Sequence, residues 1–417
     1  MELQITATDP EHVTTLLDLP WDVPLSEWPE KHLVALPRGI SRHVVRFARA
    51  GHEVFAVKEV GEWAAVREYA LLRDLDRLAV PAVDPVAVVT RRTDAHGQPL
   101  EPVLITRQLK GSLPYRSMFE TTMRPGTIKR LLDALAVLLV RLHLSGFAWG
   151  DCSLSNTLFR RDAGAYAAYL VDAETGQIQP RLTDGQRGYD LDVAQVNIVG
   201  ELMDLEAGGS LHPSVDPVPF GRDLIDRYGE LWHELTRTSV YPRDKRHYID
   251  RRIRRLNDLG FDVAEMQIQR SPDGDAVTFL PKVVDAGHHQ RQLLRLTGLD
   301  AEENQARSLL NDLETWMAGQ EDYEDYAPGD SPAEGGLGGA RPEVLAHRWV
   351  RDVFRPTVRT IPRGLREGLD TAQVYHELLE HRWYLSERAR RDIGMEAAAE
   401  DYIATVLARR EGDAAVP

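Results

Sequence analysis

The sequence contains a single cysteine and no apolar run long enough to cross a bilayer. Cys152 is the one cysteine among 417 residues, so a disulfide within the chain and a zinc site built from several cysteines are excluded. The most apolar stretch, Leu131 to Leu144, is too short for a bilayer span and contains Asp133 and Arg141. The acidic N-terminus lacks the apolar core of a signal peptide, so we expect a cytoplasmic protein without a membrane span.

Positive charge is also scarce. The 50 lysines and arginines stand against 65 aspartates and glutamates, which leaves a formal net charge of −15. This balance disfavours a general nucleic-acid binder, because such a protein binds by neutralising phosphates. Only six of the 50 basic residues are lysines, so a lone lysine within a predicted strand is more informative than usual.

The rest of the composition is that of a globular protein. Hydrophobic residues make up 43% and charged residues 28% of the chain, which provides ample material for a hydrophobic core. At about 150 residues per domain, the length predicts two to three domains.

Apolar periodicity predicts strands with one helix, followed mostly by helices. Residues 42–60 alternate around Ala50-Gly51, which is typical of a β-hairpin, and residues 62–78 show the three- and four-residue spacing of a helix. Further strands are expected at 84–90, 102–108, 157–160 and 169–172, and further helices at 127–145 and 189–206. This order predicts an α+β fold with two lobes.

Residues with complementary chemistry follow one another along these elements. They are Lys58 at the end of a predicted strand, Glu68 on the next helix, Asp151 and Asn156 in the loop after an apolar helix, and Asp172 and Glu174 after the next strand. Any one of them has an ordinary structural explanation, such as a turn or an edge strand. Their joint order and spacing are much harder to explain in that way.

Each of these residue types suits one step of phosphoryl transfer from ATP. A strand lysine can neutralise the α- and β-phosphates, and a helix carboxylate can hold that lysine in place. A loop aspartate can orient an acceptor hydroxyl. An asparagine five residues later and an aspartate on the next strand can bind Mg²⁺, which prefers hard oxygen ligands.

The set resembles the protein-kinase-like superfamily in its atypical branch, nearest the lipopolysaccharide (Kdo-type) kinases. The stretch REYALLRDLDRLAVPAVDPVAV is similar to that branch's helix and the VP-x-x-x-PV strand after it. The resemblance covers roughly residues 34–205, about two fifths of the chain. The whole layout also resembles uncharacterised actinobacterial proteins in which a domain of unknown function follows such a core.

The resemblance implies roles for the residues near the phosphates. Lys58 corresponds to the phosphate-binding lysine and Glu68 to its carboxylate partner. Glu62 is the rival partner, because Lys58 and Glu68 are close in sequence. Gly39 and Ser41 belong to the candidate phosphate loop at 36–42, which has one glycine where typical kinases have three.

The resemblance also implies roles around the metal and the acceptor. Asp151 corresponds to the catalytic-loop aspartate, and Asn156 and Asp172 correspond to magnesium ligands. Glu174 stands where a second carboxylate reaches the metal in some small-molecule kinases. Asp192 is the candidate for the buried aspartate that braces the catalytic loop.

These implications define the expected architecture, a two-lobed protein-kinase-like fold with an additional, mainly α-helical C-terminal domain. The expected segments are an N-terminal extension at 1–33, an N-lobe at 34–110, a C-lobe at 111–235, a helical and hairpin domain at 236–318, a disordered acidic linker at 319–342 and a helical segment at 343–417. Within the third domain, Asp273-Gly274 marks the turn of a predicted hairpin.

The expected function is the transfer of the γ-phosphoryl group of Mg-ATP to a hydroxyl group. The acceptor stays open among a sugar, a glycolipid precursor, a small metabolite and a protein. One alternative is a nucleotide-binding pseudokinase whose C-terminal domain binds a protein partner. Another is an RNA- or anion-binding protein that uses the basic segment 237–255, which carries eight basic and two acidic side chains.

Overall fold

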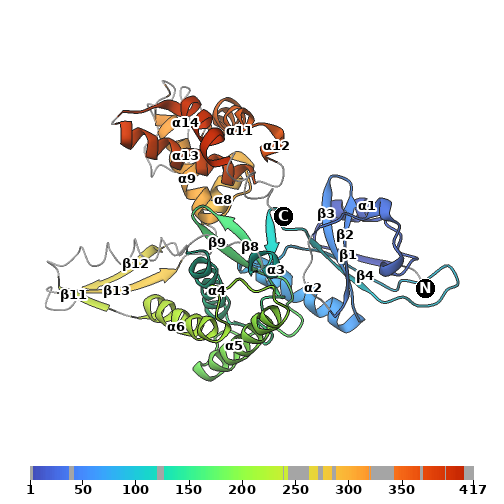
Figure 1. The fold of residues 1–417 in the computed structure, drawn as a ribbon. Coiled ribbons are helices and arrows are strands. Elements are labelled where there is room, and N and C mark those ends of the chain that lie inside the picture. The colour runs from blue at the N-terminus through green and yellow to red at the C-terminus, as the bar shows by residue number, and fades with distance from the viewer. Residues whose placement is uncertain are drawn as a thin grey trace, which may run out of the picture. The chain divides into compact units, whose positions relative to one another are not determined.

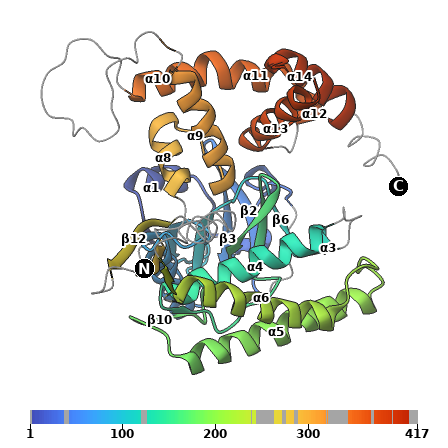
Figure 2. The same cartoon turned by 90° about the vertical axis from the view of Figure 1, so that its left-hand side faces the viewer.

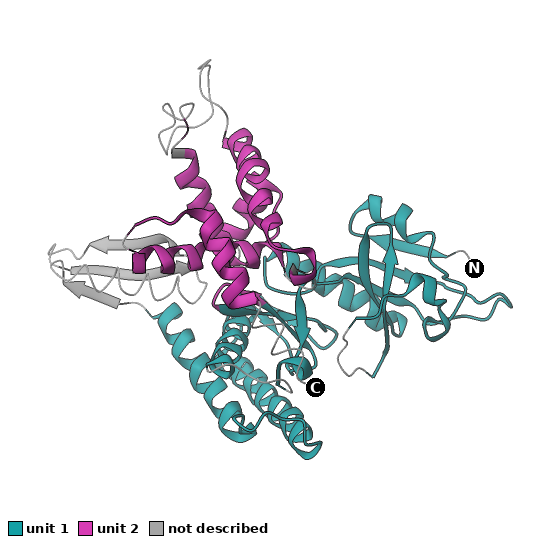
Figure 3. Cartoon of the chain, turned by 45° about the horizontal axis from the view of Figure 1, so that its top comes forward, with its two compact units in different colours: residues 1–160, 165–286 teal, residues 161–164, 287–417 magenta. Residues whose placement is uncertain are grey.

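The computed structural model divides into two compact units (Figure 3). Unit 1 comprises residues 1–160 and 165–286, and unit 2 comprises residues 161–164 and 287–417. The structure describes residues 3–36, 42–119, 126–237, 239–242, 263–270, 276–283, 288–318, 320, 342–366, 370–389 and 391–407.

Unit 1 begins with a five-stranded antiparallel sheet in the order β1-β4-β5-β3-β2. The strands are β1 (Gln4–Ala7), β2 (Val44–Ala50), β3 (Glu53–Glu59), β4 (Pro85–Thr90) and β5 (Val103–Arg107). The predicted hairpin at 42–60 is confirmed as β2–β3, and Gly51 takes a φ of +61° in its turn, where a side chain would be strained.

Helix α2 (Glu62–Arg77) follows β3 directly and contacts β4 and β5 of the sheet (Figure 1). Its buried face carries Ala65, Glu68, Tyr69 and Leu72, at the three- and four-residue spacing that the sequence predicts. Glu68 is the one acidic residue on this apolar face, and it points away from water.

The N-terminal segment is built into the same lobe. Strand β1 pairs with β4, and the segment continues through α1 (Pro10–Leu16) and two short 3-10 turns, η1 (Leu25–Glu27) and η2 (Glu30–His32). The guanidinium of Arg92 is buried beneath it and donates hydrogen bonds to the carbonyls of Trp21, Val23 and Glu101 and to the Glu59 carboxylate. Residues 3–33 are therefore an integral part of this lobe, to whose sheet they add strand β1, and not a separate extension.

The rest of the described part of unit 1 is mostly helical. The elements are β6 (Ser112–Pro114), α3 (Tyr115–Phe119), α4 (Thr127–Leu144), β7 (Phe147–Ala148), β8 (Thr157–Asp162), β9 (Ala165–Leu170), β10 (Gln177–Ile178), α5 (Asp184–Ala207) and α6 (Pro217–Thr236). Helix α6 packs against both α4 and α5 (Figure 2). Helix α4 also packs against β9. Strands β6, β8 and β9 form one small sheet, and β7 pairs with β10.

The last part of unit 1 is a three-stranded sheet in the order β11-β13-β12. Its strands are β11 (Ser239–Pro242), β12 (Val263–Arg270) and β13 (Ala276–Val283), so the predicted second hairpin is confirmed. Its turn at Asp273-Gly274 and most of the basic segment 237–255 lie outside the described residues.

Unit 2 is helical. It contains α8 (His288–Thr297), α9 (Glu303–Ala318), α10 (Pro342–Trp349), the π-helical turn η5 (Val350–Phe354), α11 (Arg355–Thr360), α12 (Arg363–Arg366), α13 (Thr371–Ala389), α14 (Gly394–Tyr402) and η6 (Ile403–Leu407). Its core is built around Leu309, Leu313, Trp349, Phe354 and Tyr375. Most of the predicted linker, 319 and 321–341, lies outside the described residues.

The predicted fold class is confirmed, since a sheet-rich N-terminal part is followed by mostly helical structure. Among the described residues, no helix combines the length and apolarity that a membrane crossing needs.

The Arg92→Ala variant tests whether the N-terminal segment is part of the lobe. It leaves the Glu59 carboxylate without its buried cation, and we expect the free energy of unfolding to fall by about 3–5 kcal/mol. The matched control is Arg91→Ala, since Arg91 is exposed. Urea denaturation of the full chain measures both, and a loss below about 1 kcal/mol for Arg92→Ala would contradict the buried role.

Candidate functional site

Lys58 joins three parts of unit 1 through two short ion pairs. Its Nζ lies 2.9 Å from Glu68 Oε2 on α2 and 2.7 Å from Asp172 Oδ2, which follows β9. The more distant Glu174 Oε2 lies 3.9 Å away. Glu62, the rival partner, is exposed at the start of α2, so the carboxylate that meets Lys58 from this helix is that of Glu68.

The positions of Glu62 and Glu68 around helix α2 explain why only Glu68 meets Lys58. Glu62 and Glu68 are six residues apart, so they cannot both face the sheet together with Ala65 and Leu72. Glu68 shares the buried face and is 0% exposed.

Burial and charge set the protonation of the pair. Burial raises the pKa of Glu68 to about 7, repulsion from Asp172 adds to the rise, and Lys58 opposes it. Burial lowers the pKa of Lys58, but the carboxylates of Glu68 and Asp172 outweigh that effect and raise it above its usual value. The ammonium therefore stays charged and holds two carboxylates together that would otherwise repel each other.

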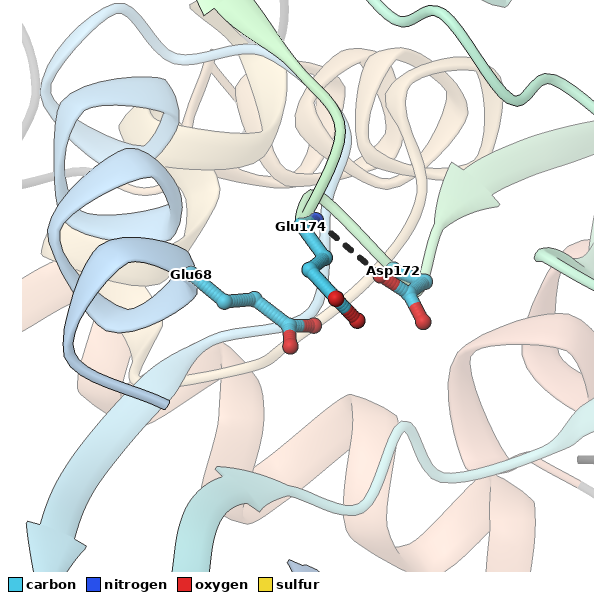
Figure 4. A group of neighbouring side chains, drawn as sticks. All are labelled: Glu68, Asp172 and Glu174. Carbon is cyan, nitrogen blue, oxygen red and sulfur yellow. Dashed lines mark hydrogen bonds between the residues drawn. The ribbon is translucent and has the colours of Figure 1, made fainter. Parts of the chain in front are cut away.

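The segment after β9 is held by its neighbours. Trp149 Nε1 donates to the carbonyl of Asp172 over 2.8 Å, and the Glu174 amide donates to Asp172 Oδ1 over 3.0 Å. Arg67 of α2 donates to the carbonyls of Glu174 and Gly176. Figure 4 shows the side chains of Glu68, Asp172 and Glu174 converging from the helix and from this segment.

A second group of polar side chains surrounds Asp151. Asn156 Nδ2 lies 3.2 Å from Asp151 Oδ2, and Asn197 Nδ2 lies 3.1 Å from Asp151 Oδ1. The same two amides also donate to the carbonyls of Asp151 and Cys152. Both oxygens of the Asp151 carboxylate are thereby oriented, although Asn197 was not among the residues that the sequence singles out.

The start of this loop is braced by Asp190 of α5. Its carboxylate accepts hydrogen bonds from the amides of Trp149 and Gly150 and from His143 Nε2. Burial would raise the pKa of Asp190, but the hydrogen bonds from His143 and the two amides lower it below its usual value. His143 in turn lies 2.7 Å from the hydroxyl of Tyr228.

The prediction that Asp192 braces the loop is therefore wrong. Asp192 is exposed, whereas Asp190 is 1% exposed. The two residues are two positions apart on a helix, so they point to different sides, and only Asp190 faces the loop.

Glu201 braces the end of the same loop. Its carboxylate accepts the amides of Leu154 and Ser155 at 2.6 and 3.1 Å. Asp190, Asn197 and Glu201 are spaced by seven and four residues, which places them on one face of α5. That spacing was the sequence signal for Asn197 and Glu201.

One cavity of about 610 Å³ connects these groups. Lys58, Asp151, Asn156 and Asp172 all line it. One part of its wall is apolar, formed by Val45, Phe47, Ala56, Val83, Leu158 and Val171. Leu36 and Arg42 line it from the two ends of the candidate phosphate loop, while Gly39 and Ser41 lie outside the described residues.

Three carboxylates with hard oxygen ligands for a cation lie together, and one of them, Asp172, lines this cavity. Oxygens of Glu68, Asp172 and Glu174 lie within 4.8 Å of one another. Glu174 Oε2 is buried and accepts no hydrogen bond among the described residues, although Arg42 and His43 approach it at 3.5 and 3.7 Å. Glu68 is fully buried, whereas Asp172 and Glu174 are half-buried, so the carboxylates of Asp172 and Glu174 are the more accessible to a divalent cation.

Two family models match the chain. Residues 45–197 match the lipopolysaccharide kinase (Kdo/WaaP) family, and residues 230–407 match a domain of unknown function, DUF4032. No curated protein matches the chain. Among solved structures it is similar to "WaaP in complex with acyl carrier protein", with 15% identity and a TM-score of 0.34, over 61% of this chain and 99% of that one.

The matched regions agree with the resemblance carried by the sequence motifs. The first contains Lys58, Glu68, Asp151, Asn156 and Asp172. The chain thus combines a region that matches the lipopolysaccharide kinase (Kdo/WaaP) family with a C-terminal region that matches DUF4032.

Proposed function

We propose that the protein is an ATP-dependent phosphotransferase that moves the γ-phosphoryl group of Mg-ATP to a hydroxyl acceptor. The observation that carries this proposal is the Lys58 ammonium, held by Glu68 and Asp172 at the wall of a cavity that Asp151 and Asn156 also line. The proposed nucleotide site lies within the expected lobes at 34–110 and 111–235.

The apolar part of the cavity suits the base of the nucleotide. Val45 and Ala56 come from β2 and β3, and Leu158 comes from β8, so a flat ring can be covered from both lobes. Val83 and Val171 also line the cavity. Burying a purine here would remove apolar surface from water, which favours binding independently of the contacts that the phosphates make.

The charged part of the cavity suits the phosphates and their metal ion. Lys58 would neutralise phosphate oxygens, because its ammonium remains charged in this setting. Asp172, with Asn156 and Glu174, would hold Mg²⁺. The bound ion would neutralise charge on the phosphates as the phosphoryl group moves.

Asp151 suits the acceptor side. Hydrogen bonds from Asn156 and Asn197 fix its carboxylate, so it can accept a hydrogen bond from an incoming hydroxyl without first having to be ordered. Asp190 and Glu201 keep the loop in place through its backbone amides. The acceptor oxygen would form a bond to the γ-phosphorus as the bond from that phosphorus to the bridging oxygen breaks and ADP leaves, and the proton of the hydroxyl would pass toward Asp151.

The Asp172→Asn variant tests the nucleotide site. We expect ATP affinity in the presence of Mg²⁺ to fall at least about tenfold, or about 1.4 kcal/mol, because the variant loses a charged metal ligand. Asp192→Asn is the matched control, since it makes the same chemical change at an exposed position of α5. Calorimetric titration measures both. Unchanged binding in Asp172→Asn, or no binding by a folded wild type, would contradict the proposed nucleotide site.

The Asp151→Asn variant separates binding from turnover. We expect Mg-ATP affinity to stay within about threefold of the wild type, while phosphoryl transfer to water or to the protein itself falls by about 100- to 10,000-fold. Release of labelled phosphate from ATP gives the rate. Wild-type turnover in this variant would exclude the role given to Asp151, whereas binding without turnover in the wild type would favour the pseudokinase alternative.

A further inference from the structure

Unit 2 contains four residues that lie far from the rest of it in sequence. Residues 161–164 form the tip of the hairpin between β8 and β9, yet they belong to the compact unit of residues 287–417 (Figure 3). They lie within the region that matches the kinase family and outside the region that matches DUF4032. Their contacts show why they group with the helices.

Asp162 caps helix α9 from outside that helix. Its Oδ1 accepts the amides of Asn304 and Gln305 at 2.9 and 3.1 Å, and its Oδ2 accepts Asn304 Nδ2 at 2.9 Å. These amides belong to the first turn of α9, whose donors have no partner within the helix. A carboxylate also suits the positive end of the helix dipole.

The backbone of the tip is held by two buried glutamines. Gln305 Nε2 donates to the carbonyl of Arg161 over 2.9 Å and to Gln373 Oε1 over 2.6 Å. Gln373 Oε1 also accepts the amide of Ala163 over 3.2 Å. The tip, α9 and α13 thus share one polar network, and Gln305 and Gln373 are 0% and 5% exposed.

A buried hydrogen-bond network of this kind is sensitive to the loss of any one of its donors. Burial raises the pKa of Asp162 to about 6, against the hydrogen bonds from Gln305 and Asn304 that lower it. A buried carboxylate without these donors would be strongly unfavourable. The tip is therefore held in one position as long as the first turn of α9 is intact.

The other end of the hairpin carries two of the proposed magnesium ligands. Asn156 immediately precedes β8, and Asp172 follows the end of β9 by two residues. Strands β8 and β9 are hydrogen-bonded neighbours, so the hairpin connects its tip to both side chains. Loss of order at the tip would propagate along this short ladder.

We propose that Asp162 is a positioning residue, through which the C-terminal helical unit keeps Asn156 and Asp172 ordered for binding Mg²⁺. The inference that these two side chains bind the metal rests on the proposed function. The attachment of the tip to α9 and α13 does not. In this role, the DUF4032 region contributes to the order of the proposed metal site and is not a separate module.

Hydrogen exchange tests the attachment. In Asp162→Ala, we expect amides of 157–160 and 165–170 to exchange at least about tenfold faster than in the wild type. Arg161→Ala is the matched control, because it removes the neighbouring exposed side chain and keeps the carbonyl that Gln305 binds. If Asp162→Ala does not fold, Asp162→Asn replaces it, since an asparagine keeps Oδ1 but loses the charge and the acceptor for Asn304 Nδ2.

The magnesium dependence of ATP binding tests the positioning role. The readout is the ratio of ATP affinity with Mg²⁺ to ATP affinity with a chelator. A general weakening of the base pocket would lower both affinities by the same factor and leave this ratio unchanged. We expect this ratio to fall about tenfold in Asp162→Ala and to stay within about twofold in Arg161→Ala. A variant that was merely less stable would lose affinity in both conditions alike.

The two measurements separate failure of this proposal from failure of the proposed function. Exchange rates within about twofold of the wild type in the Asp162 variant would overturn the attachment. Faster exchange with an unchanged ratio would overturn the positioning role. If the wild type shows no magnesium-dependent binding, the proposed function fails, and with it the positioning role; the exchange rates then decide on the attachment alone.

Discussion

The contact between the Lys58 ammonium and two carboxylates is the constraint on which the candidate site depends. Glu68 arrives on the buried face of α2, and Asp172 arrives on the segment after β9, so one cation ties the sheet to both. Repulsion from Asp172 already contributes to the raised pKa of Glu68, and an uncharged residue at position 58 would leave that repulsion uncompensated. In the proposed function, a phosphate group bound with its own cation would replace Asp172 as the partner of Lys58.

Helix α5 provides the second constraint, since its residues hold the loop around Asp151 at both ends and in the middle. Asp190 accepts amides at the start of the loop, Asn197 reaches Asp151, and Glu201 accepts amides near its end. These hydrogen bonds replace water at backbone groups that a tight loop cannot pair by itself. The loop is therefore ordered by side chains that lie more than thirty residues further along the chain, and two amides already orient the carboxylate of Asp151.

The local sequence pattern was enough to predict most elements of the kinase-like region. It could not show which residue of an element makes a particular long-range contact. The β2–β3 hairpin and helices α2 and α4 have strong periodicity, and the structure has them where the sequence predicts them. Asp192 is the wrong candidate because the loop that the bracing aspartate has to face is not visible in a helical pattern. Strand β1 was missed for a similar reason, since four residues become a strand through pairing with β4. The roles of Lys58, Asp151 and Asp172 are still predictions, because proximity alone does not establish chemistry.

The matched sequence regions and the compact units divide this chain differently, and the difference has a physical cause. One match ends at 197 and the other begins at 230, whereas unit 2 begins at 287 and includes 161–164. The carboxylate of Asp162 accepts the first-turn amides of α9, so these hydrogen bonds link the two matched regions. The boundaries of the matched regions therefore do not coincide with the boundary between the compact units. In the proposed positioning role, the β8–β9 hairpin, whose tip is held by α9 and α13, couples the two regions in stability, and this coupling requires no ligand and no change in fold.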